Sequence, residues 1–261
     1  MTLHHRWIWL MWALLMCWSL RAASMDATIA VAANFRDAAT SIAEYLESIS
    51  DHRYQVVSGS TGKLASQIIA GAPFDVLMAA DQRRPSLLIE RGLAVPDTLS
   101  TYAVGELGLW WPNASTPLTV AALATLPPHR VCIANPAIAP YGEAARAVLS
   151  RAGFDESWLQ GLVRVDNVNA VAGMVASAQV TAGFIARASV TLSERHAGIE
   201  IDEQDVIWLQ DYPPIKQDLV LLTRANDNPA ARFWVVQLQD PAVRQLIRAH
   251  GYQLLSELVA P

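Results

Sequence analysis

Four short segments of this 261-residue chain place small or polar residues between a predicted strand and the start of a predicted helix. The first N–H groups of a helix lack partners within the helix and carry a partial positive charge. Such a segment can therefore hold an anion without a cation. Each segment taken alone is also an ordinary helix cap, so the pattern leaves both interpretations open. The segments are Ala33-Asn34, Ser60-Thr61-Gly62, Pro140-Tyr141-Gly142 and Asn167-Val168.

The elements that must position these segments alternate along the chain. Short apolar runs typical of buried strands are followed by segments with helical spacing of apolar residues, which predicts an α/β fold with parallel strands. The predicted strands lie at 28–33, 54–57, 74–78, 107–111, 131–134, 162–165, 182–186 and 219–223. The predicted helices lie at 35–49, 64–70, 85–91, 143–151 and 170–178, with two more that start near Asn228 and Pro241.

The N-terminus has the composition of a secretory signal peptide. A basic stretch, His4-His5-Arg6, precedes an apolar run from Trp7 to Trp18, and small residues follow up to Ser24. The apolar run is short for a membrane span. We therefore predict that residues 1–24 form a signal peptide and that the mature chain is periplasmic, with an uncleaved membrane anchor as the alternative.

Charge and cysteine content restrict the partners of the mature chain. Removing residues 1–24 takes away two arginines and no acidic residue, which leaves 17 basic residues against 24 acidic ones, a net charge of −7. Nucleic acid is not an expected partner, because binding a phosphate backbone needs a basic surface. Cys132 would be the only cysteine, so no internal disulfide can form. One small anion in a cleft remains compatible with this charge, because neutral donors can bind it.

Motifs of the main rival classes are missing. A phosphate-binding P-loop at Gly59-Ser-Thr-Gly-Lys-Leu64 would need a glycine at Val57 and a hydroxyl residue at Leu64. The chain contains no Gly-x-Ser-x-Gly elbow, no His-x-x-x-His pair and no Cys-x-x-Cys pair. A secreted hydrolase that uses Ser60 as its nucleophile stays open as the alternative from the enzyme class.

Four longer motifs resemble the periplasmic molybdate-binding proteins of ABC importers, and the resemblance is collinear over essentially the whole mature chain. It implies a type II periplasmic-binding fold, in which two α/β lobes are joined by crossover strands and hold the anion between them. It also implies no cofactor, and delivery of the anion to a membrane permease. The motifs are Thr28-Ile-Ala-Val-Ala-Ala-Asn-Phe35, Gly59-Ser-Thr-Gly-Lys-Leu-Ala-Ser-Gln-Ile68, Gly71-Ala-Pro-Phe-Asp-Val-Leu-Met-Ala-Ala-Asp81 and Tyr212-Pro-Pro-Ile-Lys-Gln-Asp218.

The resemblance assigns one ligand position to each of the four segments. Asn34 matches the donor of the first loop, and Thr61 matches the ligand of the second, with Ser60 beside it as a less certain ligand. Tyr141 matches the third position, and Val168 the fourth, where a backbone N–H would bind.

One residue departs from the pattern. Some relatives carry a tyrosine on the strand after the fourth helix, where this chain has Ala186. We expect the hydroxyl of Tyr141 to replace the missing one.

Chain order gives the expected division into lobes. One lobe would comprise 25–103 plus 215–261 and the other 104–214, with crossovers near Ala103-Val104 and Pro213-Pro214. Asn34 and Thr61 would then lie on one lobe, and Tyr141 and Val168 on the other. We expect a monomer whose hinge closes around the anion.

A pocket made only of donors favours a dianion without a proton, such as molybdate, tungstate or sulfate. Hydrogen phosphate would direct its own proton at a donor, which costs about 1–3 kcal/mol in a desolvated site. The choice of molybdate over sulfate rests on the resemblance alone, and a sulfate or general oxyanion receptor is the alternative.

Overall fold

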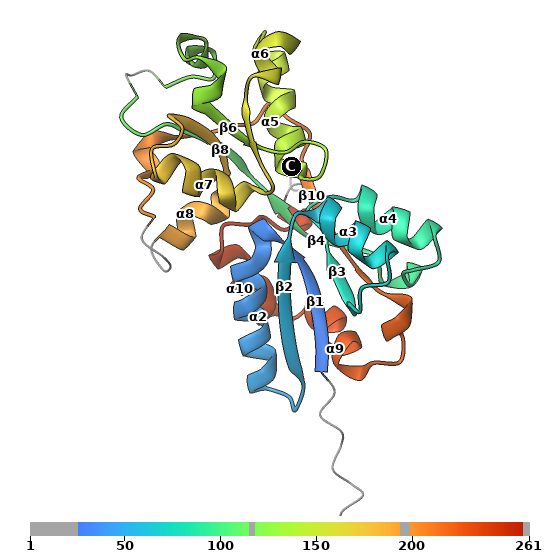
Figure 1. The fold of residues 1–261 in the computed structure, drawn as a ribbon. Coiled ribbons are helices and arrows are strands. Elements are labelled where there is room, and N and C mark those ends of the chain that lie inside the picture. Colours follow the sequence, from blue (N-terminus) through green and yellow to red (C-terminus); the bar gives the residue numbers. More distant parts are fainter. Residues whose placement is uncertain (1–25, 115–117, 194–198, 258–261) are drawn as a thin grey trace, which may run out of the picture.

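The computed structural model describes residues 26–114, 118–193 and 199–257, so the predicted signal peptide at 1–24 lies outside the described residues. In these ranges the chain forms two five-stranded sheets, each with helices packed on it (Figure 1). This arrangement confirms the predicted two-lobed α/β architecture. Within the same ranges, no helix is both long enough and apolar enough to cross a membrane.

The first sheet has the strand order β2-β1-β3-β10-β4. β1 runs parallel to β2 and β3, whereas β10 runs antiparallel to both β3 and β4. Its strands are β1 (Asp26–Ala32), β2 (Arg53–Gly59), β3 (Val76–Met78), β4 (Ser100–Gly105) and β10 (Ile215–Leu221). The helices of this half are α2 (Arg36–Ser48), α3 (Thr61–Ile69), α4 (Arg83–Glu90), α9 (Pro229–Gln237) and α10 (Pro241–Ala249), with 3-10 turns η2 (Ala33–Phe35), η3 (Pro96–Thr98), η7 (Thr223–Ala225) and η8 (Leu255–Glu257).

The second sheet has the order β7-β6-β8-β5-β9. β6 runs parallel to β7 and β8, whereas β5 runs antiparallel to β8 and β9. Its strands are β5 (Leu107–Trp110), β6 (Val131–Ala134), β7 (Val163–Val165), β8 (Ala182–Ala186) and β9 (Val206–Trp208). The helices of this half are α5 (Pro140–Arg151), α6 (Glu156–Gln160), α7 (Val168–Ala176) and α8 (Arg187–Ser193), with 3-10 turns η4 (Ala121–Thr125), η5 (Pro128–Arg130) and η6 (Glu203–Asp205).

The chain passes between the two sheets at two places. Only Glu106 separates β4 in the first sheet from β5 in the second, and residues 209–214 lead back from β9 to β10. β4 extends to Gly105, two residues beyond position 103, where we placed the first boundary. The two sheets are therefore linked by two short neighbouring segments, which suits a hinge.

The sequence prediction of elements missed the helices α6 and α8, and it was wrong at the crossing strands. β10 begins at Ile215 rather than at 219, and β4 and β9 were not predicted. The predicted parallel pairing holds for the strand pairs made by β1 and by β6, but β4, β5, β9 and β10 run antiparallel to their neighbours. The start of β10 is polar, and its Gln217 and Asp218 are buried only because other segments supply hydrogen bonds. Local hydrophobicity therefore indicates only the end of this strand, from Leu219 on, and not its start.

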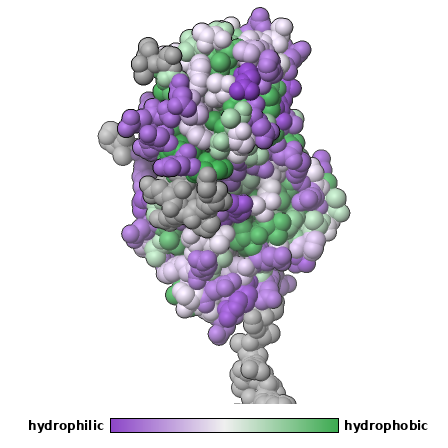
Figure 2. Space-filling view, turned by 60° about the vertical axis from the view of Figure 1, so that its left-hand side comes forward, coloured by the Kyte–Doolittle hydropathy of each residue, from purple (hydrophilic) through white to green (hydrophobic). Residues whose placement is uncertain are grey.

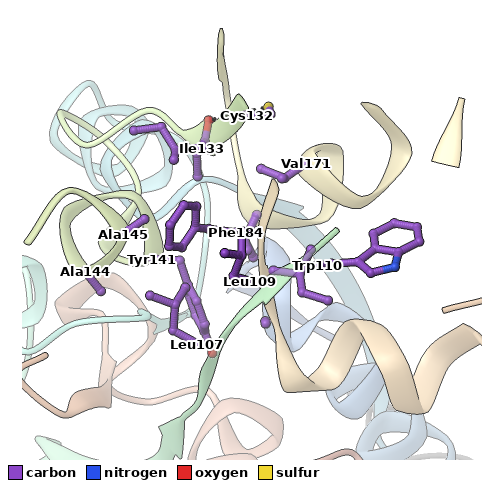
Figure 3. Packing of buried hydrophobic residues seen from close by; sticks show 14 of the residues in the cluster. Leu107, Leu109, Trp110, Cys132, Ile133, Tyr141, Ala144, Ala145, Val171 and Phe184 are labelled. Carbon is purple, nitrogen blue, oxygen red and sulfur yellow. Dashed lines mark hydrogen bonds between the residues drawn. The ribbon is translucent and has the colours of Figure 1, made fainter. Parts of the chain in front are cut away.

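Separate hydrophobic cores pack against the two sheets. The core of the second half includes Phe184 of β8, which is 1% exposed, and Leu109 of β5 (Figure 3). In the first half, the apolar face of α2 contributes to the core, because Ala38, Ile42 and Leu46 on that face are buried. Hydrophilic side chains are spread over both halves of the face shown in Figure 2.

Replacing Phe184 with alanine tests the core of the second half. We expect Phe184→Ala to lower the free energy of unfolding by about 3–5 kcal/mol, because a large cavity would remain in a closely packed interior. Urea denaturation followed by circular dichroism measures this. The matched control is Val236→Ala on the exposed face of α9, where the side chain is 66% exposed and a change within about 0.5 kcal/mol is expected. Equal losses in the two variants would contradict this packing.

Candidate anion-binding site

A small cavity lies between the two halves, where loops of the first sheet face helix starts of the second. In this state the cavity has room for about one water molecule. All five residues predicted from the sequence, Asn34, Ser60, Thr61, Tyr141 and Val168, line it. The other lining residues are Ala32, Ala33, Ala80, Ala139, Pro140 and Asn167.

Three helices begin at this cavity. Thr61 is the first residue of α3 and Val168 is the first residue of α7. α5 begins at Pro140, which has no N–H, so Tyr141 supplies the first main-chain donor of that helix. Because N–H groups in the first turn have no partner within a helix, these starts direct partial positive charge at one point from both halves.

The hydroxyl of Ser60 stands apart from the other polar groups of the cavity. Ser60 is 4% exposed, and its Oγ has no hydrogen-bond partner among the described residues. It occupies the N-cap position of α3 but makes no side-chain cap bond. Asn167, by contrast, caps α7 by accepting a hydrogen bond from the N–H of Ala170 at 3.1 Å. The ordinary cap interpretation therefore holds for Asn167 and not for Ser60.

The hydroxyl of Thr61 has a structural partner. Its Oγ1 accepts a hydrogen bond from the main-chain N–H of Ala80 at 3.1 Å, which ties the start of α3 to the end of β3. Thr61 is 1% exposed. This side chain positions the loop, whereas the neighbouring Ser60 hydroxyl is left without a partner.

The side chain of Asn34 is directed into the protein. Its Nδ2 donates to Gln217 Oε1 at 2.9 Å and to the Tyr252 hydroxyl at 3.1 Å. The Tyr252 hydroxyl in turn donates to the main-chain oxygen of Asn34 at 2.6 Å. Both amide hydrogens of Asn34 are thus used within the protein, so the donor that remains for the cavity at this position is the main-chain N–H.

Tyr141 is buried, and its hydroxyl contacts the crossing strands. The hydroxyl accepts a hydrogen bond from Gln217 Nε2 at 3.5 Å. The side chain extends from α5 past Leu107 of β5 (Figure 3). Burial raises the pKa of Tyr141 well above its ordinary value, so the phenol keeps its proton. Ala186, where some relatives have a tyrosine, is buried in β8 opposite Leu107 and does not line the cavity.

Hydrogen bonds between the two halves close the structure around the cavity. The Gly62 N–H donates to the Ile138 oxygen at 2.9 Å, and Asn169 Nδ2 donates to the Ala33 oxygen at 2.7 Å. Three charged contacts surround these, namely Lys63 with Asp166, Arg83 with Glu143 at 3.0 Å, and Arg84 with the Ala137 oxygen at 3.1 Å. The residues that line the cavity carry no charged side chain at neutral pH, and the described part of the chain holds no cluster of potential metal ligands.

The profile of the bacterial extracellular solute-binding protein family matches residues 27–253. This chain belongs to that family. A relative in Rhodobacter capsulatus, named molybdate-binding protein ModA, is 34% identical over 240 residues, which cover 92% of this chain and 93% of the relative. The protein of the same name in Azotobacter vinelandii is 36% identical over 240 residues, with coverage of 89% and 92%.

A solved structure extends this comparison to the fold. The periplasmic molybdate-binding protein of Azotobacter vinelandii superposes on this solute-binding protein with a TM-score of 0.78 and 28% identity, over 87% of this chain and 99% of that one. The cavity therefore lies in a fold that a protein named for periplasmic molybdate binding shares.

Gly62 offers a test of the close approach between the halves. A Cβ at this position would lie 2.9 Å from the Cα of Ile138, closer than two such atoms can approach. We expect Gly62→Ala to hold the halves apart and to increase the radius of gyration in small-angle X-ray scattering. Gly173→Ala in α7 is the control, because its Cβ would meet no atom within 4 Å. An unchanged radius for Gly62→Ala would contradict the role of this contact.

Proposed function

We propose that this protein is an extracytoplasmic receptor that captures molybdate and delivers it to the permease of an ABC importer. The observation that carries the proposal is a cavity of neutral donors at three helix starts, in a chain 34% and 36% identical to proteins named for molybdate binding. Export through the predicted signal peptide at 1–24, a periplasmic location and a monomeric state belong to the same proposal.

Each sheet with its helices would act as one lobe. The chain passes from one sheet to the other at Glu106 and at residues 209–214, so we place the hinge at these two segments rather than at 103/104. The direct contacts between the halves describe a closed state, in which an anion would be satisfied from both sides. Such a closed state is what the permease would recognise.

The proposed ligands are one hydroxyl and a set of main-chain N–H groups. Ser60 Oγ would donate its proton to the anion, because this buried oxygen otherwise has no partner in the described structure. The main-chain N–H groups of Asn34, Thr61, Tyr141 and Val168 would supply the other hydrogen bonds. In this assignment Ser60, and not Thr61, provides the hydroxyl of the second loop.

This donor set favours an anion that only accepts hydrogen bonds. Molybdate and tungstate present four oxygens without a proton near neutral pH, and so does sulfate. Selection among them depends on ion size and on the cavity dimensions in the occupied state. The names of the relatives favour molybdate, and a sulfate or general oxyanion receptor is the alternative.

A hydrolase that uses Ser60 has less support. A serine nucleophile needs a base to take its proton. The described residues that line the cavity include no histidine, carboxylate or lysine, and the pKa of Tyr141 is raised by burial, which keeps its phenol protonated. This environment favours binding over turnover.

Calorimetry with the mature chain tests the proposed ligand. We expect molybdate to bind more tightly than sulfate, with no binding of phosphate, because a protonated phosphate oxygen would leave a donor unpaired at a cost of about 1–3 kcal/mol. Titrations of the three salts into the same preparation provide the comparison. Equal or tighter binding of sulfate would replace the proposal with a general oxyanion receptor.

Ser60→Ala separates the ligand role of this residue from a structural one. We expect the Kd for molybdate to rise about 10-fold to 150-fold, since a hydrogen bond to a charged group contributes about 1.5–3 kcal/mol. The free energy of unfolding should stay unchanged or increase, because the variant removes a buried hydroxyl that has no partner. Ser58→Ala, at an exposed position of β2, is the matched control. Unchanged affinity in Ser60→Ala would remove Ser60 from the site.

A further inference from the structure

The side chain of Gln217 joins three segments that meet behind the cavity. Gln217 lies on β10 and is fully buried, at 0% exposure. Its Oε1 accepts hydrogen bonds from Asn34 Nδ2 at 2.9 Å and from the Tyr102 hydroxyl at 3.1 Å. Its Nε2 donates to the Tyr141 hydroxyl at 3.5 Å. Asn34 and Tyr102 belong to the first half of the molecule, whereas Tyr141 comes from the second.

We propose that Gln217 is a positioning residue that couples the anion-binding loop at Asn34 to closure of the second lobe through Tyr141. This inference rests on the proposed function, because it assumes that the anion binds the closed state. Gln217 does not line the cavity and would act on the anion only through these two neighbours.

The direction of the hydrogen bonds is determined by the groups themselves. Asn34 Nδ2 can only donate, so it requires the oxygen of the Gln217 amide and turns the Nε2 donor toward Tyr141. Burial raises the pKa values of Tyr102, Tyr141 and Tyr252 well above the ordinary range, so all three phenols stay neutral. The network therefore keeps one orientation over the physiological pH range.

Gly105 provides the space in which this contact forms. A Cβ at Gly105 would lie 2.0 Å from the Tyr141 hydroxyl oxygen and 2.8 Å from Gln217 Nε2. Gly105 is the last residue of β4 and directly precedes the crossing at Glu106. The Tyr141 phenol of the second lobe thus packs beside the hinge in a space that any side chain larger than that of glycine at position 105 would fill.

Closure then changes the surroundings of two polar groups. In an open form, Tyr141 would leave with α5, and water would reach both its hydroxyl and Gln217 Nε2. In the closed form both groups are buried and have each other as partners. Without Gln217, the phenol of Tyr141 would be buried without a partner in the closed state but solvated in the open state. Closure would then cost more free energy, and the Kd for the anion would rise.

The decisive experiment compares Gln217→Met with Tyr102→Phe in the mature chain, using sodium molybdate. We expect Gln217→Met to raise the Kd at least about fivefold and to weaken the molybdate-induced decrease in radius of gyration. Tyr102→Phe removes a hydroxyl whose proton is shared between the Ala79 main-chain oxygen at 3.0 Å and the same Gln217 oxygen at 3.1 Å, both within the first lobe. Its Kd should stay within about twofold of wild type. Wild-type affinity in Gln217→Met, or equal losses in both variants, would overturn the coupling.

Gly105→Ala provides a second variant that should fold, because the severe clash, at 2.0 Å, is with the phenol of the other lobe, and the clash within the first lobe, at 2.8 Å, involves only the movable end of the Gln217 side chain. It should also raise the Kd and keep the open radius when molybdate is added. Affinity equal to wild type would contradict the proposed docking of Tyr141 at the hinge.

Gln217→Glu adds a readout that a packing role would not move. A protonated carboxyl can accept from Asn34 and donate to Tyr141 as the amide does. A carboxylate would have to accept from a reversed Tyr141 hydroxyl, and closure would bury its charge, whereas water would reach it in the open form. Burial raises the pKa of a carboxyl group, so the Kd of this variant relative to wild type should increase between about pH 6 and about pH 9.5. A ratio that does not change with pH would contradict the burial of this side chain on closure.

Failure of the proposed function would look different. A wild-type chain that does not bind molybdate at all would remove that function before any variant is compared. Wild-type binding combined with unaffected Gln217 variants would remove only the coupling.

Discussion

Main-chain N–H groups that their own helices cannot satisfy are the constraint on which the rest of this structure depends. α3, α5 and α7 begin at one small cavity, and the first turn of each helix leaves donors that the helix cannot satisfy. A buried donor without a partner costs about 1–3 kcal/mol, so an acceptor with several oxygens satisfies groups that would otherwise destabilise the closed form. The strand ends of both sheets serve to bring these helix starts together.

Neutral donors also explain how an acidic chain can hold a dianion. A nearby lysine or arginine would attract many anions of different shape, whereas main-chain donors have fixed directions. Charged residues are present around the cavity but are paired across its rim, as in Lys63 with Asp166 and Arg83 with Glu143. These exposed pairs contribute little to stability individually. Their placement at the rim keeps the charge out of the cavity while linking the two halves.

The sequence predicted the cavity better than it predicted the hinge. Each ligand segment is local, since a strand, a small or polar residue and a helix start follow one another in the chain, and all five predicted residues line the cavity. The structural role of the Thr61 hydroxyl was not predictable, because its partner is the N–H of Ala80, which lies 19 residues away. The use of the Asn34 amide by Gln217, 183 residues away, was equally hidden. A polar run such as Ile215-Lys-Gln-Asp218 becomes a buried strand only when distant partners are in place.

Those distant partners form a polar network with no net charge between the cavity and the hinge. A buried amide or phenol in such a network is costly unless every partner is present, so the arrangement is sensitive to small displacements. Gln217 and Asn34 have fixed donor and acceptor ends, and the buried tyrosines keep their protons because burial raises their pKa values. Displacing α5 would break the contact of Tyr141 with Gln217 while leaving the contacts of Gln217 with Asn34 and Tyr102 intact. In the proposed coupling, the network would therefore favour the position of the second lobe in which Tyr141 reaches Gln217, a directional preference that an apolar hinge of the same size would lack.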